Sequence, residues 1–232
     1  MVSLREIKDS FLHLLFPHVC DGCGSDLLSK NSMLCLHCLE GIPQTDFEKH
    51  PGNPIEKRFY GRLPLEQAAA SYYFTKESLV QKLVHQVKYK GNKELGIQLG
   101  QLMGDLLKRS GRFPVDAMIP LPLFPVKEKK RGYNQSMLLC EGIRSQLPVP
   151  ILNNVITRPE HTETQTKKGR IERWKNMEGK FVLTDPAAIA GKHILLVDDV
   201  ITTGATLESC GSTLLKAENV KLSVACLCYS AR

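Results

Sequence analysis

Apolar and polar residues along this chain follow two different periods, which predict strands and helices in alternation. Continuous or alternating apolar runs predict five strands, at 68–74, 115–122, 149–156, 194–197 and 222–229. Apolar residues spaced by three and four predict helices over 79–87 and 95–106, with a break at 91–92, and a further helix from 137 to 143. Strands that alternate with helices in this way are typical of a parallel α/β sheet.

The fourth of these strands leads into the most informative pattern of the chain. Four apolar residues, 194–197, precede Asp198 and Asp199, and a Thr/Gly loop with an amphipathic run follows. In open α/β sheets ligands bind beyond the carboxyl ends of the strands, which is where both carboxylates lie. The backbone N–H groups of the loop point toward a helix N-terminus and favour a phosphate. A sugar phosphate suits both halves, with its hydroxyls on the carboxylates and its phosphate in the loop.

A purely structural interpretation of this pattern stays open. Asp198 and Asp199 then only end a strand, and Thr202 or Thr203 caps the next helix. Adjacent carboxylates repel each other, however, so stability alone gives little reason to place two of them at one strand end.

Cysteine spacing near the start of the chain predicts a metal site. Two Cys-x-x-Cys pairs, separated by eleven residues, are formed by Cys20, Cys23, Cys35 and Cys38. Four thiolates complete a closed tetrahedral shell around Zn²⁺, so we expect this zinc to be structural rather than catalytic. A pair of disulfides is the alternative. Cys226 and Cys228 alternate along a predicted strand and are expected in the core.

Composition and charge limit the class of protein. Of 232 residues, 42% are hydrophobic, which is enough for a core, and no run approaches the length of a membrane span. We find no signal-peptide pattern and expect a cytoplasmic protein, in which cysteines serve as metal ligands or core residues. The net charge of +7 is concentrated in 127–131 and 158–180. Such basic segments indicate a phosphate-rich partner, either a pyrophosphate or a nucleic acid.

The predicted organisation has three parts. Residues 1–45 form an N-terminal helix and the zinc ribbon, and 66–232 form the α/β domain. Proline, glycine and charge dominate the range between them, so 46–65 is predicted to be a linker. The basic stretch 158–180 has few apolar residues and is predicted to be an exposed flap. The basic segment 127–131 is predicted to be a loop that closes over a ligand.

Two resemblances connect these patterns. The string from Ile194 to Thr206 resembles the phosphoribosyl pyrophosphate (PRPP) motif of type I phosphoribosyltransferases. The order of motifs along nearly the whole chain is similar to that of the ComF family, late competence proteins that pair a zinc ribbon with a phosphoribosyltransferase-like domain. The further motifs that carry this likeness are Phe16-Pro17, Cys20-x-x-Cys23-Gly24, Cys35-x-x-Cys38, His85-Gln-x-Lys88-Tyr89-x-Gly91, Ile119-Pro-Leu-Pro122, Arg131-Gly-Tyr-Asn134-Gln135 and Gln165…Arg173…Asn176…Phe181.

The resemblance implies a fold, ligands and partners. It implies a type I phosphoribosyltransferase fold, a parallel sheet flanked by helices, with Mg²⁺ bound together with PRPP. Asp198 and Asp199 would face the ribose hydroxyls and are the candidate catalytic residues. The remaining candidate PRPP residues are Thr202, Thr203, Gly204, Ala205 and Thr206 for the 5-phosphate, and Pro120, Leu121, Pro122, Lys129 and Arg131 for the pyrophosphate. A role in natural transformation would add single-stranded DNA and a competence helicase or other DNA-processing proteins as partners.

Three functions remain open at this point. The chain is a phosphoribosyltransferase, a non-catalytic single-stranded-DNA-binding accessory protein that retains the PRPP fold, or a scaffold docked through its zinc module. Candidate nucleic-acid contacts are the basic residues Lys129, Lys130, Arg131, Lys167, Lys168, Arg170 and Arg173. The sequence does not identify an acceptor base.

Overall fold

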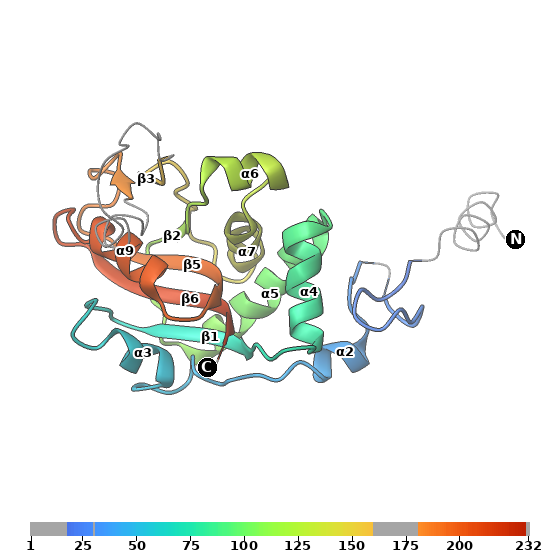
Figure 1. Ribbon diagram of the computed structural model, residues 1–232. Coiled ribbons are helices and arrows are strands. Elements are labelled where there is room, and N and C mark those ends of the chain that lie inside the picture. Colours follow the sequence, from blue (N-terminus) through green and yellow to red (C-terminus); the bar gives the residue numbers. More distant parts are fainter. Residues whose placement is uncertain (1–17, 30, 160–180, 231–232) are drawn as a thin grey trace, which may run out of the picture. The chain divides into compact units, whose positions relative to one another are not determined.

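The chain divides into two compact units, Met1–Pro43 and Gln44–Arg232. The computed structural model describes residues 18–29, 31–159 and 181–230 of them. In the first unit, turns that contain Cys20 and Cys23 precede a short helix, α2 (Leu36–Glu40). The second unit contains all the strands of the described residues and is built around one four-stranded sheet (Figure 1).

The sheet is parallel throughout, as the alternation of strands and helices predicts. Its order is β1 (Ala68–Tyr73), β6 (Lys221–Tyr229), β5 (His193–Ile201) and β2 (Ala117–Pro120). The two central strands, β5 and β6, are buried along almost their whole length. Cys226 and Cys228 lie in this core, which confirms the prediction for both residues.

The predicted strand at 149–156 is wrong in most of its length. Within this range, Ile151 makes an isolated bridge to Met118 of β2, and Ile156 begins a different strand. A separate two-stranded antiparallel sheet follows, formed by β3 (Ile156–Thr157) and β4 (Val182–Leu183). Pro148 and Pro150 lack the N–H donors that a longer ladder needs, so the pairing with β2 is confined to a single bridge.

Three helices cover one face of the sheet: α4 (Leu79–Tyr89), α5 (Lys93–Ser110) and α7 (Gln135–Arg144). Val84, Leu99 and Leu139 of these helices meet Leu227 of β6. Helices α5 and α7 pack against each other very closely, because a Cβ atom at Gly142 would lie 2.1 Å from a carbonyl oxygen of α5. This tight packing fixes α7, and with it the start of that helix at the sheet edge.

The other face carries α9 (Ala205–Leu214) and α3 (Pro54–Phe59). A Cβ atom at Gly211 of α9 would lie 2.8 Å from Leu222 of β6, so the helix runs directly on the strand. Helix α3 lies within 46–65, the range predicted to be a linker. Asn53 caps α3, and Ile55 and Phe59 are buried, so this range is a folded part of the second unit. Its proline and glycine residues mark turns around a short helix rather than an extended connection.

Candidate functional site

The four cysteines of the first unit converge on one point. The Sγ atoms of Cys20, Cys23, Cys35 and Cys38 all lie within 4.8 Å of one another. A tetrahedral zinc ion with Zn–S bonds of about 2.3 Å separates its ligand atoms by about 3.8 Å, and the distance between the Sγ atoms of Cys23 and Cys35 is 3.6 Å. The N–H groups of Gly22 and Cys35 donate to Sγ of Cys20, which favours its thiolate form. The cluster can therefore hold a metal ion such as zinc.

In the second unit, Asp198 and Asp199 lie near the carboxyl end of the central strand β5, with Asp199 two residues before its last residue, Ile201. The last paired residue of β2 is Pro120, opposite Val197, so both carboxylates follow directly beyond the end of the neighbouring strand. The two residues are only 9% and 7% exposed, which places two acidic groups in a largely water-excluded position. Such burial costs free energy unless each group has a polar partner.

Each carboxylate has a partner from a different helix. The hydroxyl of Ser136, at the start of α7, donates to Oδ1 of Asp198 over 3.2 Å. Nζ of Lys88, in the last turn of α4, lies 2.8 Å from Oδ2 of Asp199. The fold thus holds the pair from two sides, through two residues that are remote from it in sequence.

The environment makes the two carboxylates different from an exposed pair. Burial, together with the negative charge of Asp199, raises the pKa of Asp198 to about 7, although Lys88 and the Ser136 hydroxyl act in the opposite direction. At neutral pH the protonated and the charged forms of Asp198 are therefore both populated. A group of this kind can accept a hydrogen bond from a ligand hydroxyl or donate one to it.

The loop after the acid pair, residues 202–206, begins α9. Gly204 is the N-cap residue with a φ of 80°, a conformation that glycine adopts without strain. Its Cα also faces the ring of Phe59 from α3, since a Cβ atom there would lie 3.0 Å from that ring. Thr202 and Thr203 are exposed, and the Thr203 hydroxyl accepts from the N–H of Ala205. The loop therefore presents hydroxyl groups, and the N–H groups that follow Ala205 in the first turn of α9, beside the acid pair, an arrangement that suits an anion.

The loop after β2, residues 120–122, is held by the protein itself. The N–H of Leu121 donates to the carbonyl of Val197, and the Leu121 carbonyl accepts from the Asn134 side chain. Both backbone groups of Leu121 are thus occupied. Pro120 and Pro122 line a cavity of about 290 Å³ beside this loop, together with Arg158. The guanidinium of Arg158 stacks on the ring of Phe124 at 3.6 Å, and its Nε has no hydrogen-bond partner within the described residues.

The basic segment 127–131 is helical, which corrects the prediction of a loop. Helix α6 (Pro125–Arg131) begins with a proline at its first position and ends at Gly132, whose φ is 82°. Proline pre-sets the helical φ at a first turn, and glycine allows the left-handed end, so both signals were present in the sequence. Because the segment is a helix, its basic side chains point in different directions, and only some of them can face the same ligand.

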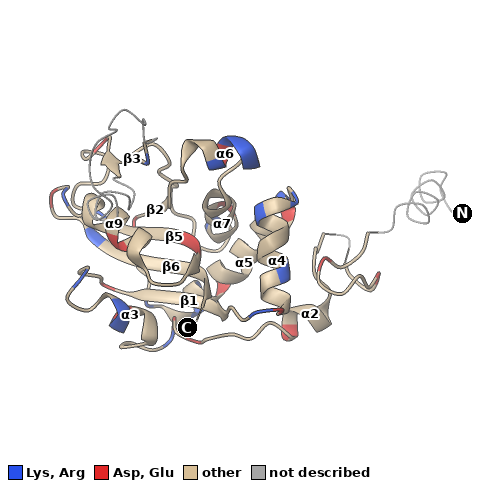
Figure 2. Ribbon diagram, in the orientation of Figure 1, with Lys and Arg blue, Asp and Glu red and all other residues tan. Residues whose placement is uncertain are grey.

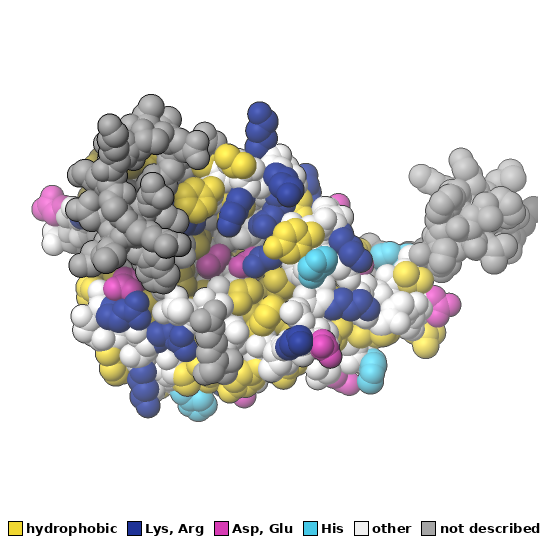
Figure 3. Space-filling view, viewed as in Figure 1, with side chains coloured by type: hydrophobic (Ala, Val, Ile, Leu, Met, Phe, Trp, Pro, Cys, Tyr) yellow, Lys and Arg dark blue, Asp and Glu magenta, His cyan; other side chains and the backbone are white. Residues whose placement is uncertain are grey.

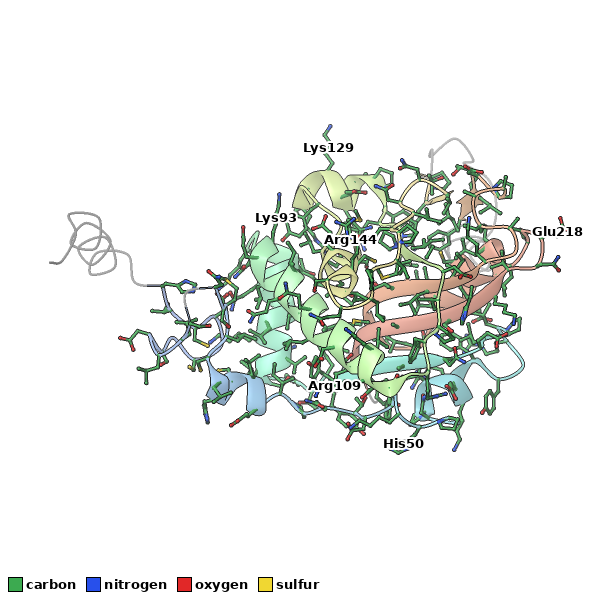
Figure 4. The ribbon with its side chains drawn as sticks, turned by 180° about the vertical axis from the view of Figure 1, so that it is seen from behind. His50, Lys93, Arg109, Lys129, Arg144 and Glu218 are labelled. Atoms are coloured by element: carbon green, nitrogen blue, oxygen red, sulfur yellow. The ribbon has the colours of Figure 1, made fainter. Side chains whose placement is uncertain are left out.

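Between α6 and the end of α4 lies a basic cavity of about 330 Å³, lined by Lys88, Tyr89, Gly91, Lys127, Lys130 and Arg131. Lys and Arg residues occur on both helices (Figure 2), and basic side chains gather on this face close to acidic ones (Figure 3). Lys129, in contrast, projects from α6 into solvent (Figure 4) and does not line the cavity.

The candidate residues are therefore brought together only in part. Asp198, Asp199 and the loop 202–206 are contiguous, and Lys130 and Arg131 reach the basic cavity. The remaining candidate nucleic-acid contacts, Lys167, Lys168, Arg170 and Arg173, lie outside the described residues. Two contacts of the acid pair were assigned no role from the sequence, Lys88 and Ser136. Lys88 belongs to the motif His85-Gln-x-Lys88-Tyr89-x-Gly91, but the motif does not indicate its contact with Asp199, because only the folded sheet brings α4 and α7 close to the end of β5.

No helix of the described ranges is long and apolar enough to cross a membrane. A model of the phosphoribosyl transferase domain family matches residues 135–232, the part that contains the acid pair and its loop. This match and the parallel sheet identify the fold of the second unit as that of the type I phosphoribosyltransferases, as predicted.

Curated relatives are similar over most of the chain. DNA utilization protein YhgH of Salmonella typhi is 31% identical over 90% of this chain and 89% of its own length. Competence protein F of Haemophilus influenzae is 29% identical over 88% and 87%. Competence protein ComFC of Bacillus subtilis is 30% identical over 88% and 82%. With this extent of similarity, and with a cysteine cluster and a phosphoribosyltransferase fold on one chain, the protein belongs to the ComF family.

Proposed function

We propose that the second unit binds PRPP at the carboxyl end of β5 and transfers its phosphoribosyl group. One observation carries this proposal: the acid pair is joined to an anion-favouring loop by the chain and to a basic cavity by Lys88. PRPP has the same three parts in the same order, a 5-phosphate, a ribose with two hydroxyls, and a pyrophosphate.

Each part of the site then has one role. Asp198 and Asp199 bind the ribose hydroxyls and orient the ring. The loop 202–206 binds the 5-phosphate through hydroxyl and backbone N–H groups. Lys130 and Arg131 hold the negative charge of the pyrophosphate in the basic cavity. Lys129, which points away from that cavity, has no part in this assignment.

The reaction we assign joins C1 of PRPP to a nucleophilic acceptor and releases pyrophosphate. Displacement at C1 depends on positioning and on stabilisation of charge more than on a side-chain nucleophile. Mg²⁺ favours carboxylate and phosphate oxygens, so Asp198 and Asp199 suit a site where it would neutralise charge on the ligand. Asp198 and Asp199 hold the ribose, and Lys130 and Arg131 hold the pyrophosphate that leaves. A screen of bases for release of pyrophosphate identifies the acceptor.

The proposal extends to the biological role and to the metal. The names of the relatives support a role in competence and DNA utilisation. We extend this role to a cytoplasmic protein whose partners are single-stranded DNA and a competence helicase or other DNA-processing proteins. The convergence of four cysteine thiols supports zinc as the metal of the first unit. We keep 1–45 as the zinc module and 66–232 as the phosphoribosyltransferase domain, and 46–65 is folded as part of the second unit.

Calorimetric titration with PRPP and Mg²⁺ tests the central claim. We expect the zinc-loaded protein to bind PRPP, and the double variant Asp198→Asn/Asp199→Asn to lose that binding while it stays folded. Glu218→Gln is the matched control, since Glu218 is an exposed carboxylate at the opposite end of the unit (Figure 4). Equal affinity in the double variant, or no binding by the unaltered protein, would overturn the proposal and leave a DNA-binding accessory protein as the better description.

A further inference from the structure

Lys88 belongs to two environments at once. Its Nζ lies 2.8 Å from Oδ2 of Asp199, and the same side chain lines the basic cavity with Lys130 and Arg131. The Lys88 side chain is 22% exposed and that of Asp199 is 10% exposed, so the ion pair lies at the border between the buried acid pair and the open cavity. Within the described residues, no other basic side chain makes an ion pair with either carboxylate of the pair.

Stability alone does not explain this ion pair. The apolar stripe of α4, with Val80, Leu83, Val84 and Val87, already attaches the helix to the core. A largely buried ion pair gains little net free energy, because removing both charges from water offsets most of their attraction. A lysine at this position therefore points to a task other than holding α4 in place.

The ion pair also conflicts with the role of Asp199 in the proposed function. An oxygen of Asp199 that is bound to Lys88 is less available to a ribose hydroxyl. A lysine can leave one anionic partner for another more easily than an arginine, because its ammonium is a compact charge with three donors on a flexible four-carbon chain. The basic cavity that Lys88 already lines offers an alternative anionic partner as soon as a pyrophosphate occupies it.

We propose that Lys88 changes partner when PRPP binds: it occupies Asp199 in the free protein and donates to the pyrophosphate in the complex, which frees Asp199 for the ribose. This inference rests on the proposed PRPP site and adds a mechanism for selectivity. A ligand that carries a pyrophosphate compensates for the broken ion pair with a new one. A ligand without it, such as ribose 5-phosphate, has to compete with Lys88 for Asp199 and receives nothing in return.

Two ligands and three variants test the exchange. The affinities of PRPP and of ribose 5-phosphate, both with Mg²⁺, are measured for the unaltered protein and for Lys88→Met, Lys88→Arg and Lys90→Met. Methionine keeps the length and the apolar part of the lysine chain and removes the charge. Lys90, an exposed lysine two residues further along, provides the matched control.

The expected result is a change in preference rather than a general loss. In Lys88→Met, the affinity for PRPP relative to that for ribose 5-phosphate falls by about ten- to a hundredfold, the range for one charge-assisted hydrogen bond to the pyrophosphate. The affinity for ribose 5-phosphate stays equal or rises, because Asp199 is then free. Lys88→Arg, which retains the charge, recovers part of the preference for PRPP, and Lys90→Met changes neither affinity.

Other outcomes separate the two proposals. A parallel fall of both affinities in Lys88→Met would show that Lys88 only supports the structure of the site, and unchanged affinities would show that it has no role. Either result overturns the exchange and leaves the PRPP site intact. If the unaltered protein binds neither ligand, the PRPP site itself fails and the exchange fails with it. Should Lys88→Met not fold, Lys88→Arg decides. If this variant keeps the preference of the unaltered protein for PRPP over ribose 5-phosphate, the exchange is supported. If it loses that preference, the exchange is overturned.

Discussion

The cysteine cluster of the first unit and the acid pair of the second are both sites of concentrated ligand atoms, but they are built in opposite ways. The four cysteines lie within nineteen consecutive residues and meet in turns and one short helix. The acid pair depends on partners from two separate helices, Lys88 and Ser136, which reach β5 only in the finished fold. One site is local and the other is assembled.

This difference determines what holds each site together. The first unit has a small core, so a metal that joins four thiolates supplies folding free energy directly. The acid pair instead lowers the free energy of unfolding of the second unit, because two nearby carboxylates are kept largely out of water. The first site stabilises its surroundings, and the surroundings stabilise the second. Replacing a cysteine of the cluster should therefore destabilise the first unit, whereas replacing a carboxylate of the acid pair should stabilise the second.

The largest effect is expected in the first unit. Replacing Cys35 with serine removes one of four zinc ligands, and structural zinc sites of this size contribute about 10–16 kcal/mol of apparent binding free energy. We expect Cys35→Ser to lose zinc and the hydrogen-exchange protection of residues 18–43, while the second unit keeps its own unfolding transition. A chelator acting on the unaltered protein should reproduce this result.

Cys140→Ser is the control for this experiment. Cys140 is fully buried in α7 and belongs to the core of the second unit. We expect this variant to retain zinc and to destabilise only the second unit, because a hydroxyl is placed in an apolar position. Protection of 18–43 that survives in Cys35→Ser would show that the first unit folds without its metal.

The same distinction explains what the sequence can predict. The cysteine spacing and the string from Ile194 to Thr206 are local patterns, and the structure places the first as one cluster and the second at the end of a buried strand. All four strands of the main sheet were also predictable, since buried parallel strands are continuous apolar runs. The cysteine spacing and the apolar runs are both set by residues close together in the chain, so both can be recognised in the sequence.

Two kinds of feature could not be predicted from the sequence. One is a contact between residues far apart in the chain, and the other is a segment in which two local signals disagree. Lys88 lies on a helix whose apolar spacing predicts the helix but not which strand end its last turn meets. The basic segment 127–131 was predicted to be a loop because its charges dominated the pattern, although Pro125 and Gly132 mark a helix between them. The run at 149–156 has apolar residues, but Pro150 within it and Pro148 just before it lack ladder donors, so only a single bridge to β2 forms.

An intermediate effect of opposite sign is expected at the acid pair. The folded protein retains the proton of Asp198 up to about pH 7, whereas an unfolded chain releases it near pH 4. Between these values the folded state binds more protons, so the free energy of unfolding falls as pH rises. Asp198→Asn removes this loss, and we expect the variant to be about 2–4 kcal/mol more stable than the unaltered protein at pH 8 and similar to it at pH 4.

Urea unfolding at several pH values measures this prediction, with Glu218→Gln as an exposed control that leaves the profile unchanged. The variant should gain stability and lose affinity for PRPP, a combination that marks a group kept for binding at the expense of the fold. A destabilised Asp198→Asn at pH 8 would mean that the charged pair supports its unit after all, and the contrast with the cysteine cluster would disappear.

The smallest effect concerns Ser136, the partner that makes the acid pair tolerable. Its hydroxyl donates to Asp198 over 3.2 Å and favours the charged form of that carboxyl, so Ser136→Ala should raise the pKa of Asp198 by about half a unit to one unit. The stability of the unit should fall by about 1 kcal/mol at pH 8, the net value of one buried hydrogen bond. Carbon-detected NMR titration of the Asp198 carboxyl measures the pKa directly, and Ser145→Ala, at the other end of α7, serves as the control. An unchanged pKa in Ser136→Ala would show that the Ser136 hydroxyl does not influence the charge of Asp198 and that α7 contributes only packing to the site.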